Sequence, residues 1–548
     1  MKKHLLILLV LGLALNSFAQ TNEDINVESK IKAIDDFLTR YEKLNKLNGT
    51  VLVSFKDEVL INKGYGYADF ESKSYNDPQS IFQIYSITKT FTSTMIFKLI
   101  EQGKLSLNDR LSKFYPFFPN GDAISIEHLL THTSGINDHS EQEDAPATEA
   151  YRVELFGKNE VNFPPGEGWS YCNGGYQLLG YIIAKITGKT YEQAIRETIF
   201  DPLQMSSSGF DYKNLASPEK VTAYHIFTEQ TKEQAVLYDS VGPYAAGSIY
   251  STVGDLYKYY QSFASHRILS EASQEIAFSP SKTNNNYGHG WQLQMDSTMS
   301  RIISHSGGAA GFRSNFAMVE KNDVCVIILN NHENANPEFL TRRIIDILNN
   351  RTFQPIIEVK LNSEELEKFV GAFSIQEPQL MLYTSILDGR LAIDVGGQGK
   401  QVVIATDQHT FFQEEADAIL EFIKDENDQY SELHIIQGSR KLIADRIEPS
   451  WGVTGTATLK GWDDSIPDIK FSEDKVVKGR WILENLNLKD GEMKFRLNND
   501  WNINYGDNNG DKILELHGEN IKVAEGIYDL ILDLTDDSNP YYFLEKKN

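Results

Sequence analysis

The sequence predicts a domain of the α/β (α+β) class, an antiparallel sheet with helical layers around it, followed by two all-β domains. Strand-like runs stand at both ends of the first 355 residues with helix-like segments between them, so the two ends are expected to complete one sheet. Beyond Pro355, short alternating runs separated by turn signals replace the helical pattern. A chain of 548 residues also exceeds what one hydrophobic core usually organises.

Local periodicity places the elements of the first domain. The predicted strands are residues 49–55, 59–62, 301–306, 312–320 and 324–330. Helices are predicted over residues 86–102, through 126–130 and over 342–348, and a further one follows Gly174-Gly175 and includes residues 178–183. Lys56-Asp57-Glu58 is expected to turn the chain between the first two strands, and Gly103 to end the first helix. That helix carries one apolar face, formed by Ile87, Phe91, Met95, Ile96 and Leu99.

The predicted boundaries are 20–355 for the α/β domain, 360–448 for a small β-barrel and 449–548 for a β-sandwich. Runs such as Leu391–Val395 and Val402–Ile404, with turn signals such as Asp388-Gly389, predict the barrel. The last region carries four tryptophans among short strands, namely Trp451, Trp462, Trp481 and Trp501.

The N-terminus is predicted to be a secretory signal peptide, residues 1–19. Lys2 and Lys3 precede an apolar run over 5–15, and small residues lead to a cut after Ala19. The run is too short to span a bilayer, and no other stretch is long enough to do so. No cysteine follows the cut, so a lipid anchor is not expected. We expect the mature protein in the periplasm or outside the cell.

Charge and cysteine content exclude some partners. The net charge is −25, and it becomes −27 once Lys2 and Lys3 are removed. So acidic a surface repels nucleic acid and anionic membranes. The two cysteines, Cys172 and Cys325, are too few for a disulfide framework and are expected to be buried thiols.

Ser86-Ile87-Thr88-Lys89 is the first motif with chemical content. Residues three apart share one helix face, so the lysine amine can reach the serine hydroxyl. A serine alcohol is a poor nucleophile until a neighbouring base takes its proton, and a helix N-terminus favours a developing oxyanion. Alone, the motif also fits an ordinary helix start with a solvated lysine.

Two further motifs carry suitable groups. Tyr171-Cys172-Asn173 offers a phenol for acid–base work and an amide that can grip a substrate, although Tyr171 also fits a packing role. His305-Ser306-Gly307-Gly308 is expected on a strand whose glycines let a substrate backbone approach closely. There the N–H of Gly308 can complete an oxyanion hole with the N–H of Ser86. A structural histidine followed by a glycine turn is the alternative.

In this order, the three motifs resemble the S-x-x-K, Y-x-N and K-T-G set of class C β-lactamases and related serine peptidases and esterases. Supporting similarities span about residues 30–345: ISIEHLLTHTSGI at 124–136, PPGEG at 164–168, DPL at 201–203, AGSIYSTVGD at 246–255 and YGHGW at 287–291. The resemblance implies a β-lactamase-like α/β sandwich with its site between the sheet and the helical part.

The resemblance also implies the role of each site residue. Ser86 matches the acylated nucleophile, Lys89 the activating cation or base, and Tyr171 the proton-shuttling phenol. Asn173 matches the substrate-binding amide, and His305 occupies the strand position usually held by lysine. Histidine is mostly neutral at pH 7, so efficient hydrolysis of carboxylate-bearing β-lactams is not expected.

Amide, ester and β-lactam bonds all stay open as substrates. A weakly catalytic protein that binds cell-wall peptides or glycans is the alternative. His132 and His289 lie in segments that resemble packing motifs of the family, and structural roles are expected for both.

No metal or cofactor is expected, because no histidine, cysteine or carboxylate cluster has ligand spacing. Residues 500–504 have Asp and Asn at alternate positions, as at the start of a calcium-binding loop. Tyr505 occupies the position that such a loop requires to be glycine, so a hairpin is predicted instead.

The C-terminal regions resemble known modules. Phe369-Val370-Gly371-Ala372-Phe373 is similar to the small lipocalin-like barrel that often follows this hydrolase domain, and residues 451–534 are similar to β-sandwich modules of starch-utilisation outer-membrane proteins. By that resemblance, Trp462, Trp501 or Tyr505 can stack on sugar rings. The alternative is that these aromatics form the sandwich core.

Overall fold

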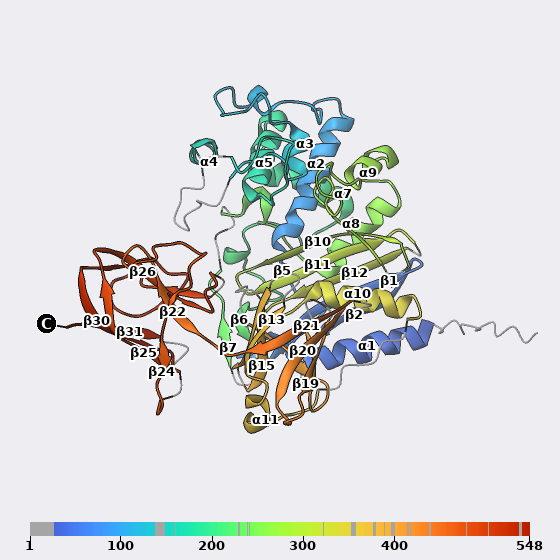
Figure 1. Cartoon of the computed structure of the whole chain (residues 1–548). Coiled ribbons are helices and arrows are strands. Elements are labelled where there is room, and N and C mark those ends of the chain that lie inside the picture. Colours follow the sequence, from blue (N-terminus) through green and yellow to red (C-terminus); the bar gives the residue numbers. More distant parts are fainter. Residues whose placement is uncertain are drawn as a thin grey trace, which may run out of the picture. The chain divides into compact units, whose positions relative to one another are not determined.

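The computed structural model describes residues 27–547 apart from 138–147, 159–160, 228–230, 238, 240–241, 297, 322, 352–357, 376–379, 388, 396–399, 414–415, 417, 438–439, 478, 502 and 536–539. The predicted signal peptide, residues 1–19, lies outside the described residues. The chain divides into two compact units between residues 354 and 355 (Figure 1), and each is described by itself. Within the described part, no helix is long and apolar enough to cross a membrane.

A six-stranded antiparallel sheet organises the first unit. Its order is β2 (Glu58–Tyr65), β1 (Gly49–Phe55), β12 (Val324–Asn330), β11 (Phe312–Val319), β10 (Arg301–Ala309) and β9 (Gln292–Met295). Strand β1 pairs with β12, with Val51 opposite Ile328, so the sheet is completed by both ends of the unit as predicted. Lys56 and Asp57 both have positive φ, which gives the hairpin turn the twist that adjacent strands need.

Helices cover both faces of this sheet (Figure 1). Helices α1 (Val27–Lys43) and α10 (Pro337–Leu348) lie on one face. The other face carries the layer formed by α2 (Thr88–Glu101), α3 (Ile126–Leu130), α4 (Glu149–Lys158), α5 (Asn173–Thr187), α6 (Tyr191–Ile195), α7 (Asp201–Leu203), α8 (Val253–Ala264) and α9 (Glu271–Ala277). Three small pairs complete the unit: β3 (Tyr67–Asp69) with β4 (Ser74–Tyr75), β5 (Phe82–Gln83) with β8 (Tyr250–Ser251), and β6 (Tyr224–Phe227) with β7 (Lys232–Gln234).

Helix α2 is more deeply buried than its sequence suggests. It begins at Thr88, after a 3₁₀ turn over Tyr85–Ile87 called η1, two residues later than predicted. Its threonines and serine are buried together with the predicted apolar face. The Thr92 hydroxyl lies 2.6 Å from the hydroxyl of Tyr191 and donates to the carbonyl of Ala245 at 2.7 Å. Hydroxyls that are bonded in this way can be buried at little cost.

The second unit begins with a nine-stranded antiparallel sheet, preceded by α11 (Ser363–Glu367). The order is β16 (Lys400–Val402), β15 (Arg390–Val395), β14 (Leu380–Leu387), β13 (Gly371–Ile375), β21 (Arg440–Ile447), β20 (Tyr430–Gln437), β19 (Ala418–Lys424), β18 (Thr410–Gln413) and β17 (Ile404–Ala405). The two edge strands are separated in the chain only by Val403, whose N–H donates to Leu391 of β15. The sheet therefore nearly closes on itself as a barrel.

Two further sheets share a second core in this unit. One contains β23 (Ile469–Lys470), β22 (Trp451–Thr454), β26 (Gly491–Leu497), β27 (Asn504–Gly506) and β28 (Glu515–Leu516), with β29 (Ile521–Val523) paired to β26. The other contains β24 (Ser472–Glu473), β25 (Arg480–Leu488), β30 (Gly526–Asp533) and β31 (Tyr541–Lys546). Strands β26 and β27 pair antiparallel, which confirms the hairpin predicted around residues 500–504. The predicted class, a mixed unit followed by all-β sheets, is confirmed.

The burial of α2 gives a first prediction. Replacing Thr92 by Val keeps the shape of the side chain but leaves the Tyr191 hydroxyl and the Ala245 carbonyl without their partner, so we expect a loss of about 1–3 kcal/mol of unfolding free energy. The same change at the partly exposed Thr187 is the control. Its hydroxyl donates to the Ile183 carbonyl of its own helix and accepts the exposed N–H of Lys189, so water can replace both bonds and the loss should be smaller. Urea denaturation measures both, and equal losses would contradict this account.

Candidate active site

Ser86 lies in the η1 turn, where the backbone is held in an unusual conformation. The preceding residue, Tyr85, has φ of +42°, a region that bulky residues rarely adopt. Ser86 itself is half-buried, and α2 starts two residues later. Strand β10 passes directly beside this turn, because a Cβ added to Gly307 would lie only 2.0 Å from the carbonyl oxygen of Ile84 and 3.2 Å from the Ser86 nitrogen. A glycine is therefore required at position 307.

Lys89 is completely buried beside Ser86. Its Nζ donates to the Ser86 hydroxyl at 3.0 Å, to Asn173 Oδ1 at 2.8 Å and to the carbonyl of Ala246 at 2.9 Å. An ammonium group has three hydrogens, and these three oxygens match them. The lysine is thus not a solvated side chain at a helix start.

Tyr171, Cys172 and Asn173 lie at the N-terminus of α5. The Cys172 sulfur caps that helix by accepting the N–H of Gly175 at 3.3 Å. The Tyr171 ring lies under the Lys89 Nζ, 4.8 Å from its centroid, and Asn173 reaches the same Nζ with its side-chain oxygen. The structure therefore brings Ser86, Lys89, Tyr171 and Asn173 to one place. Cys172 and Cys325 are both buried thiols, as expected.

Strand β10 presents an open edge at Gly308. Strand β9 pairs only with residues 301–304 of β10. The N–H of Ser306 points to that same side, where it donates to Gln292 Oε1 at 3.2 Å. Because alternate residues of a strand direct their N–H groups to the same side, the N–H of the exposed Gly308 points to the edge beyond β9. It is available there for a ligand.

His305 is buried under this edge and is electrically neutral. Burial and the positive charge of Lys89 lower the pKa of His305 to about 3. Burial lowers the pKa of His132 well below its usual range, and the charge of Lys89 adds to the effect. Lys89 is thus the cation at the centre of the site, and position 305 supplies no second positive charge near pH 7.

Two residues that were not assigned to the site from the sequence adjoin it: His132, for which a structural role was expected, and Tyr287, for which no role was predicted. The His132 ring lies 4.4 Å from the ring of Tyr171, and Tyr287 lies between His132 and His305. Their segments, around THTSG and YGHGW, are recognisable in the sequence, but nothing in them indicates contact with Tyr171. By contrast, His289 is buried near Phe97, with its Nε2 3.8 Å from Glu127, which fits the packing role expected of it.

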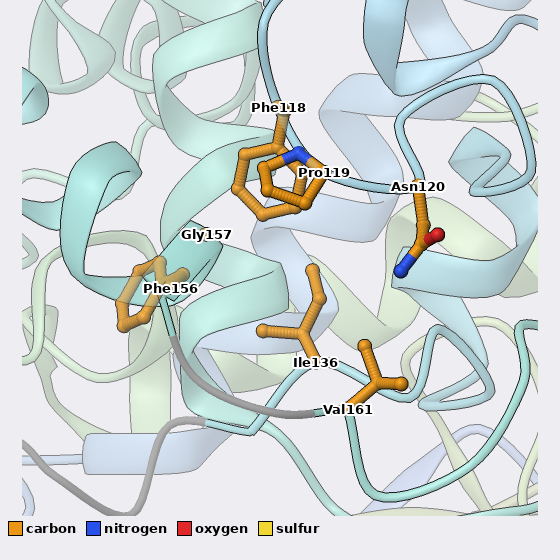
Figure 2. A pocket seen from close by; sticks show the side chains of 7 residues that line it. All are labelled: Phe118, Pro119, Asn120, Ile136, Phe156, Gly157 and Val161. Atoms are coloured by element: carbon orange, nitrogen blue, oxygen red, sulfur yellow. The ribbon is translucent and has the colours of Figure 1, made fainter.

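A largely apolar pocket of about 400 Å³ lies at the end of α4 (Figure 2). Its lining residues are Phe118, Pro119, Asn120, Ile136, Phe156, Gly157 and Val161. Phe156 also packs against Gly174, where an added Cβ would lie 2.9 Å from the ring. This wall of the pocket therefore supports the helix end that carries Asn173. Among the residues that the structure describes, no group of three or more potential ligands is arranged to hold a metal ion.

The neutral histidines predict a pH dependence of stability. The pKa of His305 is about 3 in the folded protein and about 6.5 in the unfolded chain, so below pH 6.5 only the unfolded chain takes up this proton. The stability that His305 contributes is present above pH 6.5 and is lost as the pH falls toward 3, at up to about 1.4 kcal/mol per pH unit. We expect His305→Gln to reduce the slope of unfolding free energy against pH between 4.5 and 6. The exposed His225, changed to Gln, is the control; a slope that His305→Gln leaves unchanged would contradict the prediction.

Comparison with known proteins agrees with this architecture. The Beta-lactamase family model matches residues 34–349. A Bacillus subtilis (strain 168) protein whose name, PbpX, places it with the penicillin-binding proteins is 33% identical over 327 residues, which cover 59% of this chain and 81% of the relative.

Solved structures share the fold. The octameric penicillin-binding protein homologue from Pyrococcus abyssi has a TM-score of 0.55 at 23% identity and covers 75% of this chain and 99% of its own. The D-amino acid amidase from Ochrobactrum anthropi SV3, solved with D-phenylalanine, has a TM-score of 0.52 at 23% identity and covers 59% of this chain and 99% of its own. The chain belongs to the β-lactamase and penicillin-binding protein family of serine hydrolases.

Proposed function

We propose that the protein is an exported hydrolase that cleaves an amide or ester bond through an acyl-enzyme on Ser86. The observation that carries this proposal is the 3.0 Å hydrogen bond between the Ser86 hydroxyl and the fully buried amine of Lys89. A buried amine that touches a half-buried serine at a strained turn is an arrangement typical of an activated nucleophile. Export is proposed from the basic start and the apolar run of residues 1–19, and it places the activity in the periplasm or outside the cell.

The proposed reaction assigns one task to each group. Ser86 Oγ attacks the substrate carbonyl while the Tyr171 phenolate, stabilised by the adjacent ammonium of Lys89, takes the serine proton directly or by exchange through that ammonium. The Tyr171 phenol then gives the proton to the leaving nitrogen or oxygen as the bond to the acyl carbon breaks. The oxyanion is held by the N–H groups of Ser86 and Gly308. A water molecule then attacks the acyl carbon of the ester on Ser86 and gives a proton to Tyr171. The bond between that carbon and Ser86 Oγ breaks, Oγ takes the proton back, and the acid is released.

The neutral His305 favours substrates without a carboxylate at that position. Asn173 and the open edge of β10 at Gly308 supply polar contacts for an amide or ester backbone, while Gly307 lets the strand lie close against the Ser86 turn. Burial would make it costly to leave a substrate carboxylate unpaired beside a neutral imidazole. We therefore propose D-amino-acid amides, peptides and esters ahead of β-lactams. That the D-amino acid amidase shares this fold is compatible with the proposal.

A cell-wall peptide sensor is the second candidate for the same pocket. It is motivated by the neutral histidine at position 305 and by the β-sheets that follow the hydrolase unit. A sensor would acylate once and fail to release its product, whereas an enzyme turns over.

We propose that a glycan binds to the last two sheets of the second unit, which share one core and were predicted to form a β-sandwich. Trp451 is buried and Tyr505 stacks on it at 5.5 Å, which fits the core interpretation for these two. Trp501 is 36% exposed, and its ring lies 5.8 Å from that of Trp462. The guanidinium of Arg496 lies 4.6 Å from the Trp501 ring centroid, and the indole N–H donates to Asp464, so the ring is held in place. Held, exposed indoles are suited to stacking on sugar rings.

Labelling with a serine-directed fluorophosphonate tests the nucleophile. We expect the wild type to be labelled and Ser86→Ala not to be labelled, because the probe needs an activated hydroxyl. Ser265→Ala, which changes an exposed serine, should label like the wild type. Equal labelling of the wild type and Ser86→Ala would overturn the assignment. Turnover of p-nitrophenyl esters and D-amino-acid amides over hours separates the enzyme from the sensor, and nitrocefin serves as the β-lactam comparison.

Affinity electrophoresis of the full chain on a panel of glycans tests the sandwich surface. We expect one glycan to retard the wild type and Trp501→Ala or Trp462→Ala to reduce retardation about tenfold or more, because the stacking face is lost. Leu459→Ala, which removes an apolar side chain that is 80% exposed, is the control and should behave as wild type. If no glycan retards the wild type, the proposal of glycan binding fails.

A further inference from the structure

A continuous series of hydrogen bonds links the start of α5 to strand β10. The N–H of Cys172 donates to His132 Nδ1 at 3.0 Å, and His132 Nε2 lies 3.1 Å from the Tyr287 hydroxyl. That hydroxyl lies 3.0 Å from His305 Nε2, and His305 Nδ1 lies 2.7 Å from the carbonyl oxygen of Ser306. The three side chains are buried, so these partners replace water.

The two ends of the series fix its direction. A backbone N–H can only donate, so His132 Nδ1 accepts, and neutral His132 carries its proton on Nε2. A carbonyl oxygen can only accept, so His305 Nδ1 donates, and neutral His305 has its lone pair on Nε2. Tyr287 must then accept from His132 and donate to His305. Within the series each member has one donor and one acceptor, and the two histidines are in opposite tautomers. Tyr176, which also interacts with Tyr287, donates its own hydroxyl hydrogen to the Leu130 carbonyl at 2.7 Å.

The first end holds Tyr171 from both sides. The N–H of Ser170 donates to the carbonyl of His132 at 3.0 Å, and the N–H of Cys172 donates to the ring of the same residue. The His132 ring packs 4.4 Å from the Tyr171 ring, and φ of His132 is +60°. One residue therefore sets both the backbone path and the ring position of Tyr171.

The other end reaches the turn that carries Ser86. His305 bonds the carbonyl of Ser306, and the next residue, Gly307, lies against the backbone of Ile84 and Ser86. The series thus spans the gap between the helical layer, which carries Tyr171, and the strand that borders Ser86. Its length determines how far apart the two layers stand at the site.

We propose that His132, Tyr287 and His305 form one directed hydrogen-bond chain that positions the Tyr171 phenol relative to Ser86. His132 and Tyr287 act as positioning residues, because they touch Tyr171 and His305 and contribute no group to the reacting atoms. This proposal rests on the proposed function for the role of Tyr171, while the chain itself does not depend on any activity.

The protonation states of the members are those that the chain requires. Burial, assisted by Lys89, lowers the pKa of both histidines, and burial raises the pKa of Tyr287, so all three are neutral near pH 7. A second proton on His305 would turn its Nε2 into a donor. The Tyr287 hydroxyl would then have to accept from His305 and donate to His132 Nε2. His132 would have to carry its proton on Nδ1, where that N–H would face the N–H of Cys172 with no acceptor between them. The chain therefore holds its members in place and does not conduct protons.

The tautomers are measurable in the wild-type protein. Two-bond ¹H–¹⁵N correlation spectra of full-length, ¹⁵N-histidine-labelled protein at pH 7 distinguish the Nδ1–H, Nε2–H and charged forms. His132→Gln and His305→Gln identify the two signals by their disappearance among the 12 histidines. We expect His132 in the Nε2–H form and His305 in the Nδ1–H form. Equal tautomers, or a charge on either ring, would overturn the chain.

Tyr287→Phe tests the positioning role, since it removes only the central hydroxyl. With a p-nitrophenyl ester we expect kcat to fall about tenfold or more and KM to change less than about twofold, because the proton shuttle is displaced and substrate contacts are kept. The NMR signals of both histidines should shift. Tyr212→Phe, which removes an equally buried hydroxyl bonded to the carbonyls of Ile81 and Val221, is the control and should leave kcat and both signals near wild type.

The outcomes separate the two proposals. If the two histidines have opposite neutral tautomers but Ser86 is never acylated, the proposed function is refuted and the hydrogen-bond chain is still supported. An active enzyme with equal tautomers would refute the chain alone. Opposite tautomers with a kcat that Tyr287→Phe does not lower would refute the positioning role.

Discussion

The site depends on the burial of one positive charge. Lys89 is removed from water, and an unpaired charge in a protein interior costs many kcal/mol. Its Nζ is solvated by three oxygens that come from the η1 turn, the start of α5 and the 3₁₀ turn at Tyr244–Ala246. Segments 84 and 157 residues away in the chain must therefore converge on this amine. The requirement to satisfy the charge is also what holds the serine and the amide of Asn173 beside it.

The surroundings of α2 follow from the same constraint. A lysine can be fully buried near the start of a helix only if that helix is enclosed by the rest of the fold. The helix is therefore central, and its threonines are satisfied by tyrosine hydroxyls and carbonyls, as Thr92 is by Tyr191 and Thr94 by Tyr259. Each of these tyrosines is itself buried, so the two hydroxyls in a pair replace water for one another.

Much of this arrangement could be predicted from local patterns, and some of it could not. The strands β1, β2, β10, β11 and β12 follow from β-branched runs, and the Ser86–Lys89 contact follows from helical spacing. The deep burial of α2 could not be predicted, because a helix rich in threonine has the composition of a solvent-exposed helix. The place of His132 could not be predicted either, because a histidine's role is set by its partners, and its partner Tyr287 lies 155 residues away. The segments that contain His132 and Tyr287 could be identified by their similarity to the family, but that similarity did not indicate that the two residues contact each other.

Strained backbone marks three of the segments that meet at the site. Tyr85, His132 and Tyr244 all have positive φ. Tyr85 precedes Ser86, and Tyr244 lies two residues before Ala246. His132 accepts hydrogen bonds from the residues on either side of Tyr171. Such conformations cost non-glycine residues about 1–3 kcal/mol each, and they persist only where the surrounding structure over-determines them. Here Tyr85 and His132 are buried and Tyr244 is partly buried, and each adjoins a group that bonds or packs against another segment of the site. The buried amine, the neutral hydrogen-bond series and the close approach at Gly307 thus stabilise the strained turns. In return, those turns bring the Ser86 hydroxyl, the Ala246 carbonyl and the Tyr171 ring around the amine of Lys89.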